Sequence, residues 1–375
     1  MSDARTRLDT QMMAIALRMA RRGLGTTAPN PAVGAVIVDE ATGEVIARGW
    51  TQPGGRPHAE KEALRRAGER AHGKTMYVTL EPCAHTGRTP TCSDSMVGAG
   101  LKRVVCAIPD PNPVVSGRGF AQLRAAGIEV DVGRLAEEAR WVTLGHILRQ
   151  TEERPFVQLK MALDANGRVA AGDGAPVWVT GPEARTFAHL LRARADAIMV
   201  GASTVIADDP ELTCRLPGLG HRSPDRIVLD TRLRTPPTAK VYRQAKSKPR
   251  IWVAAVLDVM AEGPGLLHGD AMLLDAAALD GGALDLEGLL STLAGNGLTR
   301  LLVEGGPTVW HAFLAAGLVD EACVILGTGA AEGQTIPVVT GDRDAYFARY
   351  KLFPVAARNR RLGADSLLVY RRESP

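Results

Sequence analysis

Apolar and polar residues alternate along the chain with two different periods. In the first 25 residues, Met12, Met13, Ala16, Leu17 and Ala20 recur at helical spacing, which predicts a helix ending near Gly23 and Gly25. The apolar stretches that follow predict a buried strand and its hairpin partner. Helical and extended patterns then take turns up to residue 133, which is typical of a layered α/β domain. The expected elements are strands at 30–39, 44–50, 74–82, 102–110 and 128–133 and helices at 58–71 and 92–100.

The alternation is interrupted once and then starts again. Residues 135–154 predict a helix that ends in a charged run, and Pro155 opens a new series of strands and helices. A chain of 375 residues also exceeds what one hydrophobic core usually organises. We therefore expect two α/β domains, at 1–147 and 154–375. The second should hold strands at 156–163, 196–201, 225–230, 250–256 and 300–306 and helices at 181–195, 286–297 and 308–317.

Composition indicates a packed globular chain. Hydrophobic residues make up 45% and charged residues 23%, and aromatic residues only 4%. The net charge of +4 comes from 45 basic and 41 acidic residues that are intermixed, which gives little support to nucleic-acid binding. No apolar run resembles a signal peptide or is long enough to span a bilayer. The five cysteines should therefore be reduced, and we expect a cytoplasmic protein without a membrane partner.

Four residues form a candidate metal centre. Zinc binds thiolate and imidazole groups tetrahedrally, and a catalytic site keeps one position open. His58, Cys83 and Cys92 offer three such ligands, and Glu60 could shuttle a proton from water to a departing amine. A His-x-Glu motif followed by Pro-Cys and a second Cys is the signature of zinc nucleobase deaminases, although eight residues separate the cysteines here instead of two. The alternatives are ordinary buried thiols or a structural zinc site without turnover.

The second half lacks a GxGxxG motif but contains "LLVEGGPTVWHAFLAAG", an apolar strand, two glycines and a helix that begins at Pro307 or Thr308. Glycines let the backbone approach a ligand closely, and a helix N-terminus offers free amides to a phosphate. The polar stretch 201–215 contains Asp208 and Asp209, which could equally cap a turn before Pro210. An ordinary turn and a phosphate site both remain open for these motifs.

Four segments of the first half resemble the bifunctional riboflavin-biosynthesis deaminase/reductase family: "APNPAVGAVIV", "HAEKEAL", "TLEPCAHTGRTPTC" and "IPDPNPVVSGRGFAQLRAAGI". The resemblance covers essentially the whole chain and implies a cytidine-deaminase-like three-layer α/β/α domain followed by a dihydrofolate-reductase-like α/β domain. It places zinc on His58, Cys83 and Cys92 and the proton shuttle on Glu60. It also implies substrate contacts at Asn30, Asp110 and Asn112. His85 lies in the loop between the two cysteines, where it could be a ligand, but the entrance or a substrate contact is the favoured interpretation. Thr91 replaces a proline that is usual in the family, and we expect little effect because it is not a ligand.

In the second half, "TVIADDPELTCR" and "VEGGPT" carry the resemblance, which implies that NADPH reduces the ribosyl side chain to ribityl. The implied NADPH contacts are Ala162, Trp178, Thr204, Asp208, Thr231, Gly306, Pro307, Thr308, Val309, Trp310, His311 and Ala312. The implied substrate contacts are Pro176, Arg192, Leu212, Arg215 and Glu304. Arg192 and Arg215 suit a 5-phosphate because a guanidinium pairs with two phosphate oxygens, whereas the alternative for Arg192 is a solvated helix face. Asn166 and Pro176 depart from the family pattern.

These observations predict a two-step enzyme with zinc and NADPH as cofactors. The first domain would deaminate a diaminopyrimidinone ribosyl phosphate, and the second would then reduce its ribosyl side chain. The substrate would be this small molecule rather than a nucleic acid or a membrane, and the resemblance implies a homo-oligomer. Two alternatives remain: a deaminase that acts on a flipped nucleic-acid base, and a zinc-stabilised scaffold that binds nucleotide without turnover.

Overall fold

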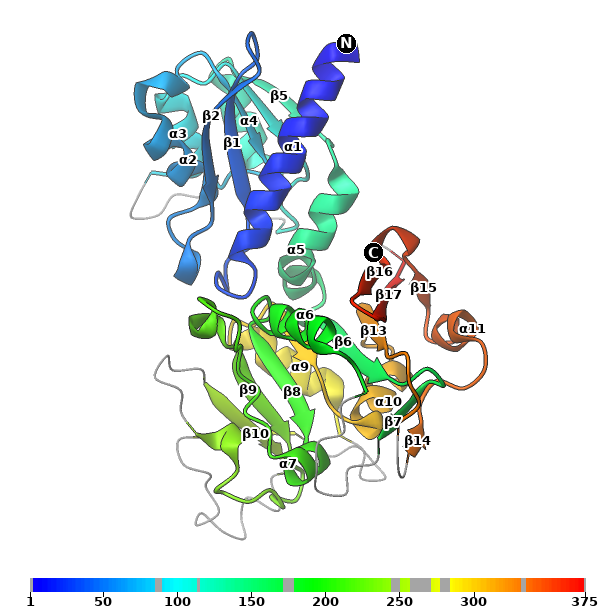
Figure 1. Ribbon diagram of the computed structural model, residues 1–375. Coiled ribbons are helices and arrows are strands. Elements are labelled where there is room, and N and C mark those ends of the chain that lie inside the picture. Colours follow the sequence, from blue (N-terminus) through cyan, green and yellow to red (C-terminus); the bar gives the residue numbers. More distant parts are fainter. Residues whose placement is uncertain are drawn as a thin grey trace. The chain divides into compact units, whose positions relative to one another are not determined.

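The computed structural model describes residues 3–84, 90–112, 115–170, 179–243, 250–256, 271–276, 284–331 and 335–373. It consists of two compact units, Met1–Glu153 and Arg154–Pro375, each with its own sheet (Figure 1).

The first unit is built on a five-stranded sheet in the order β2-β1-β3-β4-β5. The first two strands form an antiparallel hairpin, β1 also pairs antiparallel with β3, and β3, β4 and β5 run parallel. The carboxyl ends of β3, β4 and β5 and the start of β1 therefore meet at one edge of the sheet. The strands are β1 (Gly34–Asp39), β2 (Glu44–Trp50), β3 (Thr75–Val78), β4 (Arg103–Cys106) and β5 (Glu129–Val132).

Helices cover both faces of this sheet, and two glycines let two of them pack closely. A Cβ atom on Gly34 would lie 2.0 Å from the Ala16 carbonyl oxygen of α1 (Asp3–Gly23), and one on Gly49 would lie 2.2 Å from the Ala59 carbonyl oxygen of α2 (Ala59–Ala67). Gly49 is paired with Ala35, so it points to the opposite face from Gly34. The three-layer α/β/α prediction is therefore confirmed. The other helices are α3 (Cys92–Gly98), α4 (Arg118–Ala125) and α5 (Ala136–Thr151).

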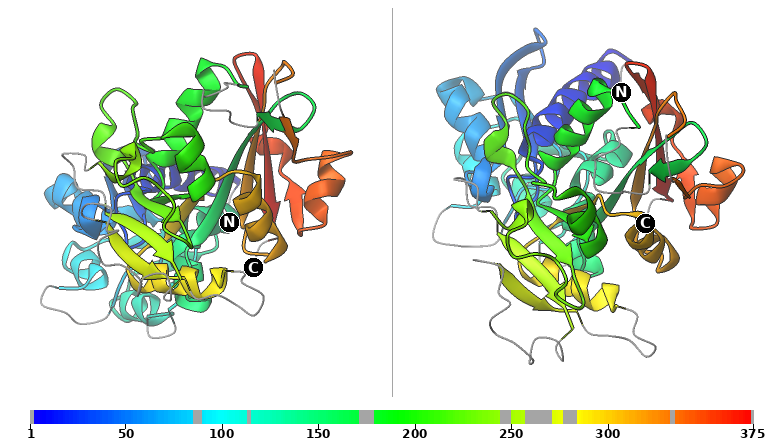
Figure 2. Two further views of the ribbon diagram at one scale, coloured as in Figure 1. Left: turned by 90° about the horizontal axis from the view of Figure 1, so that it is seen from below. Right: turned by 60° about the horizontal axis from the view of Figure 1, so that its bottom comes forward.

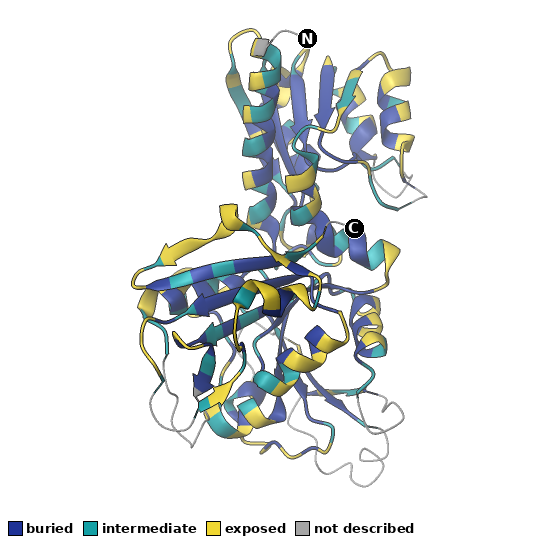
Figure 3. Cartoon of the chain, turned by 90° about the vertical axis from the view of Figure 1, so that its right-hand side faces the viewer, coloured by how far each residue is buried: buried dark blue, intermediate teal, exposed yellow. Residues whose placement is uncertain are grey.

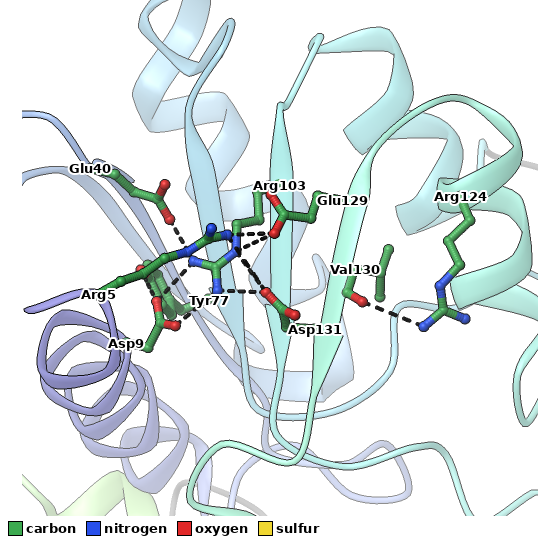
Figure 4. Close-up of polar contacts among 9 residues, drawn as sticks. All are labelled: Arg5, Asp9, Glu40, Tyr77, Arg103, Arg124, Glu129, Val130 and Asp131. Carbon is green, nitrogen blue, oxygen red and sulfur yellow. Dashed lines mark hydrogen bonds and ion pairs between the residues drawn. The ribbon is translucent and has the colours of Figure 1, made fainter. Parts of the chain in front are cut away.

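An ion network fastens α1 to the sheet at the edge where β4 and β5 begin (Figure 4). Arg103 is only 1% exposed, and its guanidinium donates to both carboxylate oxygens of Asp9 on α1, at 2.9 and 2.8 Å. The Tyr77 hydroxyl donates to the same carboxylate at 2.8 Å. Glu40 and Asp131 complete the set, at 2.5 and 2.8 Å from Arg103. A buried guanidinium is thus balanced by carboxylates from three separate segments.

The second unit has a ten-stranded sheet in the order β11-β10-β9-β8-β12-β6-β13-β17-β15, with β16 paired to β17. The strands from β11 to β13 are parallel, and β17 joins β13 antiparallel. The strands are β6 (Phe156–Leu163), β8 (Ala197–Gly201), β9 (Asp225–Leu229), β10 (Ile251–Ala255), β11 (Met272–Asp275), β12 (Arg300–Val303), β13 (Glu321–Leu326), β15 (Leu352–Pro354), β16 (Arg360–Leu362) and β17 (Asp365–Arg372). A small separate sheet pairs β7 (Arg168–Ala170) with β14 (Thr335–Pro337).

Each face of the large sheet has its own core (Figure 2). Helices α9 (Leu286–Gly295) and α10 (Pro307–Ala315) pack on the face that includes Leu159 and Val303. Helix α6 (Pro182–Arg192) packs on the other face, against Ile198 and Leu302. Figure 3 shows the strands of this unit mostly in the buried and intermediate colours, and the outer sides of its helices in the exposed colour. The α/β prediction is confirmed for this unit as well.

Some elements were not predicted. The stretch 201–215 was interpreted as turn-rich, yet it begins with α7 (Ala202–Asp208), and Asp209 follows that helix with a φ of +40°. Helix α4, strands β7 and β11, the strands after residue 330 and α11 (Arg343–Ala348) were also missed. Cys106 and Cys323 lie buried on β4 and β13, where they are part of the cores of the two units.

Candidate active sites

The structure brings the three predicted zinc ligands of the first unit together. One ligand atom from each of His58, Cys83 and Cys92 lies within 4.8 Å of the other two. His58 Nδ1 is 3.3 Å from Cys92 Sγ and 3.8 Å from Cys83 Sγ. One imidazole and two thiols at this spacing are a donor set that suits Zn²⁺ and leaves a fourth position open.

The ends of two helices place these ligands. His58 precedes the first turn of α2 with an extended backbone and makes no side-chain cap, so its ring is available as a ligand. Cys92 is the first residue of α3 and its backbone N–H points to Cys83 Sγ at 3.4 Å. The Ser93 hydroxyl donates to the Cys83 carbonyl oxygen at 3.0 Å. The second helix therefore holds one ligand and orients the other.

Glu60 is buried beside the three ligands. It is 3% exposed, and its Oε2 atom has no hydrogen-bond partner among the described residues. Burial raises the pKa of Glu60, and the charge of His58 opposes this only in part. A buried carboxylate oxygen without a hydrogen-bond partner is costly unless a ligand or a reaction uses it. This arrangement fits a group that carries a proton.

The ligands also perturb one another. The pKa of Cys83 is lowered because its thiolate accepts hydrogen bonds from Cys92 and His58, even though burial opposes the shift. The pKa of Cys92 is raised, first by its hydrogen bond to Cys83 and then by burial. The Cys83 thiolate is thus favoured before any metal binds. A cation bound between the ligands would favour the Cys92 thiolate as well.

Thr91 has a role that the sequence did not indicate. Its hydroxyl accepts from the Asp94 backbone N–H at 3.0 Å, and the Asp94 carboxylate accepts from the Thr91 backbone N–H at 3.0 Å. This capping box fixes the start of α3 directly before Cys92. A proline at this position would lack both the hydroxyl and the N–H.

We expect the Thr91→Ala substitution to lower the free energy of unfolding of the first unit by about 1 kcal/mol, because an orphan N–H loses its cap. Chemical denaturation of the full chain would measure this. Thr91→Ser keeps the hydroxyl and should stay close to the wild type. If alanine had no effect, the hydroxyl would not be what holds this helix end.

The three predicted substrate contacts of the first unit lie at the same edge of the sheet as the zinc ligands. Asp110 and Asn112 follow β4, and the Asp110 carboxylate accepts from the Asn112 backbone N–H at 2.9 Å. Asn30 precedes β1 and donates to the Gly55 carbonyl at 3.2 Å. His146 of α5 lies 3.6 Å from Asp110, a neighbour that the sequence did not indicate.

In the second unit, the predicted cofactor turn has the expected form. Helix α10 begins at Pro307, and its N-cap, Gly306, makes no side-chain cap. A Cβ atom on Gly306 would lie 3.5 Å from Thr204 Oγ1, so two predicted cofactor contacts are neighbours. This helix start follows β12, at the carboxyl edge of a parallel sheet where α/β folds bind ligands. Its free amides fit a phosphate-bearing cofactor such as NADPH.

Glu304 and Arg192 form a buried ion pair beside this turn. Arg192 Nε and Nη2 donate to the two Glu304 oxygens at 2.8 and 2.9 Å, and Nη1 donates to the Thr213 carbonyl at 3.2 Å. The solvated helix face considered for Arg192 is therefore wrong, since its side chain is 14% exposed. Two of its five N–H groups have no protein partner among the described residues and could meet a phosphate.

Lys160 of β6 is a further charge that sequence reasoning missed. Its Nζ lies 3.8 Å from Glu304, and burial lowers its pKa. Burial alone would raise the pKa of Glu304, but the charges of Arg192 and Lys160 hold it at about 2. The available signal was a pair of polar residues, Gln158 and Lys160, that interrupt an apolar strand.

The other predicted contacts vary in setting. Trp310 is buried in the core, whereas Thr308, His311 and Ala312 are exposed. Burial raises the pKa of Asp208. Arg215 is half exposed and 3.5 Å from Glu211. Leu212 is buried with a φ of +56°, Ala162 lies on β6, and Thr231 follows β9.

The departures from the family pattern are only partly visible. Asn166 is exposed on a turn that the Asp164 carboxylate holds through the backbone N–H groups of Asn166 and Arg168, both at 2.9 Å. Pro176, Trp178 and His85 lie outside the described residues.

Two family models match the chain. The cytidine and deoxycytidylate deaminase zinc-binding region matches residues 6–108, and the RibD C-terminal domain matches residues 155–344.

Similar proteins cover almost the whole chain. The riboflavin biosynthesis protein RibD of Escherichia coli is 40% identical over 92% of this chain and 95% of that protein. RibD of Aquifex aeolicus is 41% identical over 87% of this chain and 90% of that protein. RibD of Acinetobacter baumannii has a solved structure with a TM-score of 0.81 and 35% identity, covering 98% of this chain and 100% of that one.

The chain is also similar to a solved protein whose name includes two activities. It is a diaminohydroxyphosphoribosylaminopyrimidine deaminase/5-amino-6-(5-phosphoribosylamino)uracil reductase from Thermotoga maritima, with a TM-score of 0.79 and 32% identity, covering 98% of this chain and 100% of that one.

None of the helices in the described parts of this chain has the length and apolar character needed to span a bilayer.

Proposed function

Because the chain belongs to the RibD family of riboflavin biosynthesis proteins, we propose that it deaminates a diaminopyrimidinone ribosyl phosphate and then reduces the product's ribosyl side chain. We assign the first step to residues 1–147 and the second to residues 154–375. The observation that carries the proposal is the group of His58, Cys83 and Cys92 with a buried Glu60 beside it, one of whose carboxylate oxygens has no hydrogen-bond partner among the described residues.

For the deamination, His58, Cys83 and Cys92 would hold zinc, which lowers the pKa of water and so makes a nucleophile available near neutral pH. Glu60 would accept the proton of that water and pass it to the leaving ammonia. The raised pKa of Glu60 supports this role, because a carboxyl that readily takes up and returns a proton is needed. Asn30, Asp110 and Asn112 would bind the substrate.

For the reduction, NADPH would supply a hydride to C1′ of the ribosyl side chain. The Gly306 and Thr308 backbone amides at the start of α10 would bind a phosphate of the cofactor, together with Thr204, and the predicted contact segment continues to Ala312. Ala162, Trp178, Asp208 and Thr231 would complete the cofactor site. Arg192, Arg215, Leu212, Pro176 and Glu304 would bind the substrate, and Glu304 would also hold the Arg192 guanidinium in place.

We also propose that the chain works in the cytoplasm as a homo-oligomer. The five free cysteines support the location, because Cys83 and Cys92 can bind zinc only while they are reduced. The homo-oligomer rests on the family resemblance alone, and light scattering of the purified chain would test it.

The direct test is to add the undeaminated substrate and NADPH to the purified zinc-loaded protein and to follow ammonia and NADPH together. We expect ammonia to appear first and NADPH to be consumed afterwards. Ammonia without NADPH loss would confine the function to the first unit. Neither signal would favour the scaffold or the nucleic-acid deaminase, which a single-stranded oligonucleotide substrate would then distinguish.

A further inference from the structure

We propose that Glu81 is a positioning residue of the deaminase, which fixes the substrate-binding segment after β4 through backbone hydrogen bonds. The inference rests on the proposed deamination, because Asp110 and Asn112 are placed at the substrate by that proposal. The carboxylate of Glu81 is not assigned any role by the zinc chemistry.

Three backbone amides converge on this one side chain. Glu81 Oε2 accepts from the N–H groups of Asp110 at 3.1 Å and Gly117 at 3.0 Å, and Oε1 accepts from Gly119 at 3.0 Å. Glu81 is only 3% exposed. Hydrogen bonds to a buried charged acceptor are stronger than those between neutral groups. A single buried carboxylate therefore holds both segments, 108–112 and 115–119.

The backbone around α4 is shaped to receive this carboxylate. The N-cap of α4, Gly117, has a φ of +80° and no side chain that could cap the helix, so Glu81 takes over that role from another element. A Cβ atom on Gly119 would lie 2.2 Å from the Pro82 carbonyl oxygen and 3.2 Å from Glu81 Oε1. Only glycine permits the helix to approach Glu81 and Pro82 this closely.

The same residue links the segment to the zinc site. Glu81 stands two positions before the ligand Cys83, and its own N–H donates to the Ile108 carbonyl at 3.0 Å. A second contact joins the zinc site to α4. The Ser93 hydroxyl, next to the ligand Cys92, donates to Gln122 Oε1 of α4 at 2.7 Å. These contacts within the protein therefore set the position of Asp110 relative to the zinc ligands.

The test is the Glu81→Gln substitution in the full-length zinc-loaded protein. Glutamine keeps the shape but offers one acceptor oxygen, and its amide group would face a backbone N–H. A looser segment reduces the fraction of protein that is ready to bind, so we expect the KM for the deaminase substrate to rise about tenfold. The kcat should stay within about threefold, because Glu60 and the zinc ligands remain in place, and the zinc content should stay at the wild-type value.

The matched control is Asp9→Asn. Asp9 is also a buried carboxylate of this unit that accepts from several donors, but it lies at the opposite edge of the sheet. This variant should lower the melting temperature without changing KM. An equal rise of KM in both variants, or a loss of zinc in step with activity in Glu81→Gln, would show general loosening and overturn the inference.

A second measurement does not depend on turnover. In hydrogen exchange by NMR, the amides of Asp110, Gly117 and Gly119 should exchange about tenfold faster or more in Glu81→Gln than in the wild type, since each loses part of a bond to a charged acceptor. Unchanged protection of the three amides would overturn the inference. A wild type that releases no ammonia would contradict the proposed function instead, and the exchange result would still decide whether Glu81 holds the segment.

Discussion

Replacing Glu60 with glutamine is expected to slow ammonia release by about 10²–10⁴-fold, the usual contribution of a general acid–base group. The amide has the size of the carboxylate but cannot take up and return a proton. The three zinc ligands are untouched, so the zinc content should remain that of the wild type. Ammonia release and metal content measured on the same preparation would check both statements.

Glu62→Gln is the matched control for this variant. Glu62 lies on the same helix, is buried, and pairs with Arg65 and Arg66 rather than facing the zinc ligands. Its replacement should leave the rate of ammonia release close to that of the wild type. Full ammonia release by Glu60→Gln would remove Glu60 from the proposed mechanism, and loss of zinc would show that Glu60 supports the metal site instead.

Replacing Glu304 with glutamine is expected to reduce kcat/KM for NADPH oxidation by about 10²-fold, because truncating one partner of a buried charge pair costs several kcal/mol. Arg192 and Lys160 would then lack their counter-charge in a buried place. The free energy of unfolding of the second unit should fall by about 3 kcal/mol for the same reason. Steady-state kinetics with the deaminated substrate and chemical denaturation would measure the two effects.

Glu321→Gln separates activity from stability. Glu321 is buried at the start of β13 and pairs with Arg371 at 2.7 Å. It therefore lies where the parallel strands begin, whereas Glu304 lies where they end. It should lower stability but leave kcat/KM for the reduction unchanged. If Glu304→Gln kept its full kcat/KM while losing stability, Glu304 would be structural only and its place at the substrate would be wrong.

Sequence reasoning reached the α/β class of both units and a plausible zinc site because those signals are local. Alternating periods identify elements, and the motif of His58 and Glu60 followed by Cys83 and Cys92 has little other use. The structure confirms that the three ligand atoms lie within 4.8 Å. The assignment of individual reductase contacts stays a prediction.

The features that were missed depend on contacts between distant residues. The importance of Glu81 depends on backbone amides 29 to 38 positions further on, and that of Lys160 on Glu304, which directly follows another strand. The Arg192 pairing likewise bridges 112 positions. Helix α7 was hidden because its short sequence contains Ser and Thr, whose side chains also favour turns. Periodicity carries no information on such pairings.

The ion network around Arg103 also limits how this domain can change through evolution. Asp9, Tyr77 and Arg103 come from a helix and two strands, and in the interior the Asp9 carboxylate accepts hydrogen bonds from both of the others. Loss of Asp9 removes the acceptor of the Tyr77 hydroxyl and of two Arg103 hydrogen bonds, whereas an apolar set of similar volume could replace all three residues together. Drift at these positions is therefore constrained to concerted steps, and a lineage that has changed one should carry compensating changes at the other two.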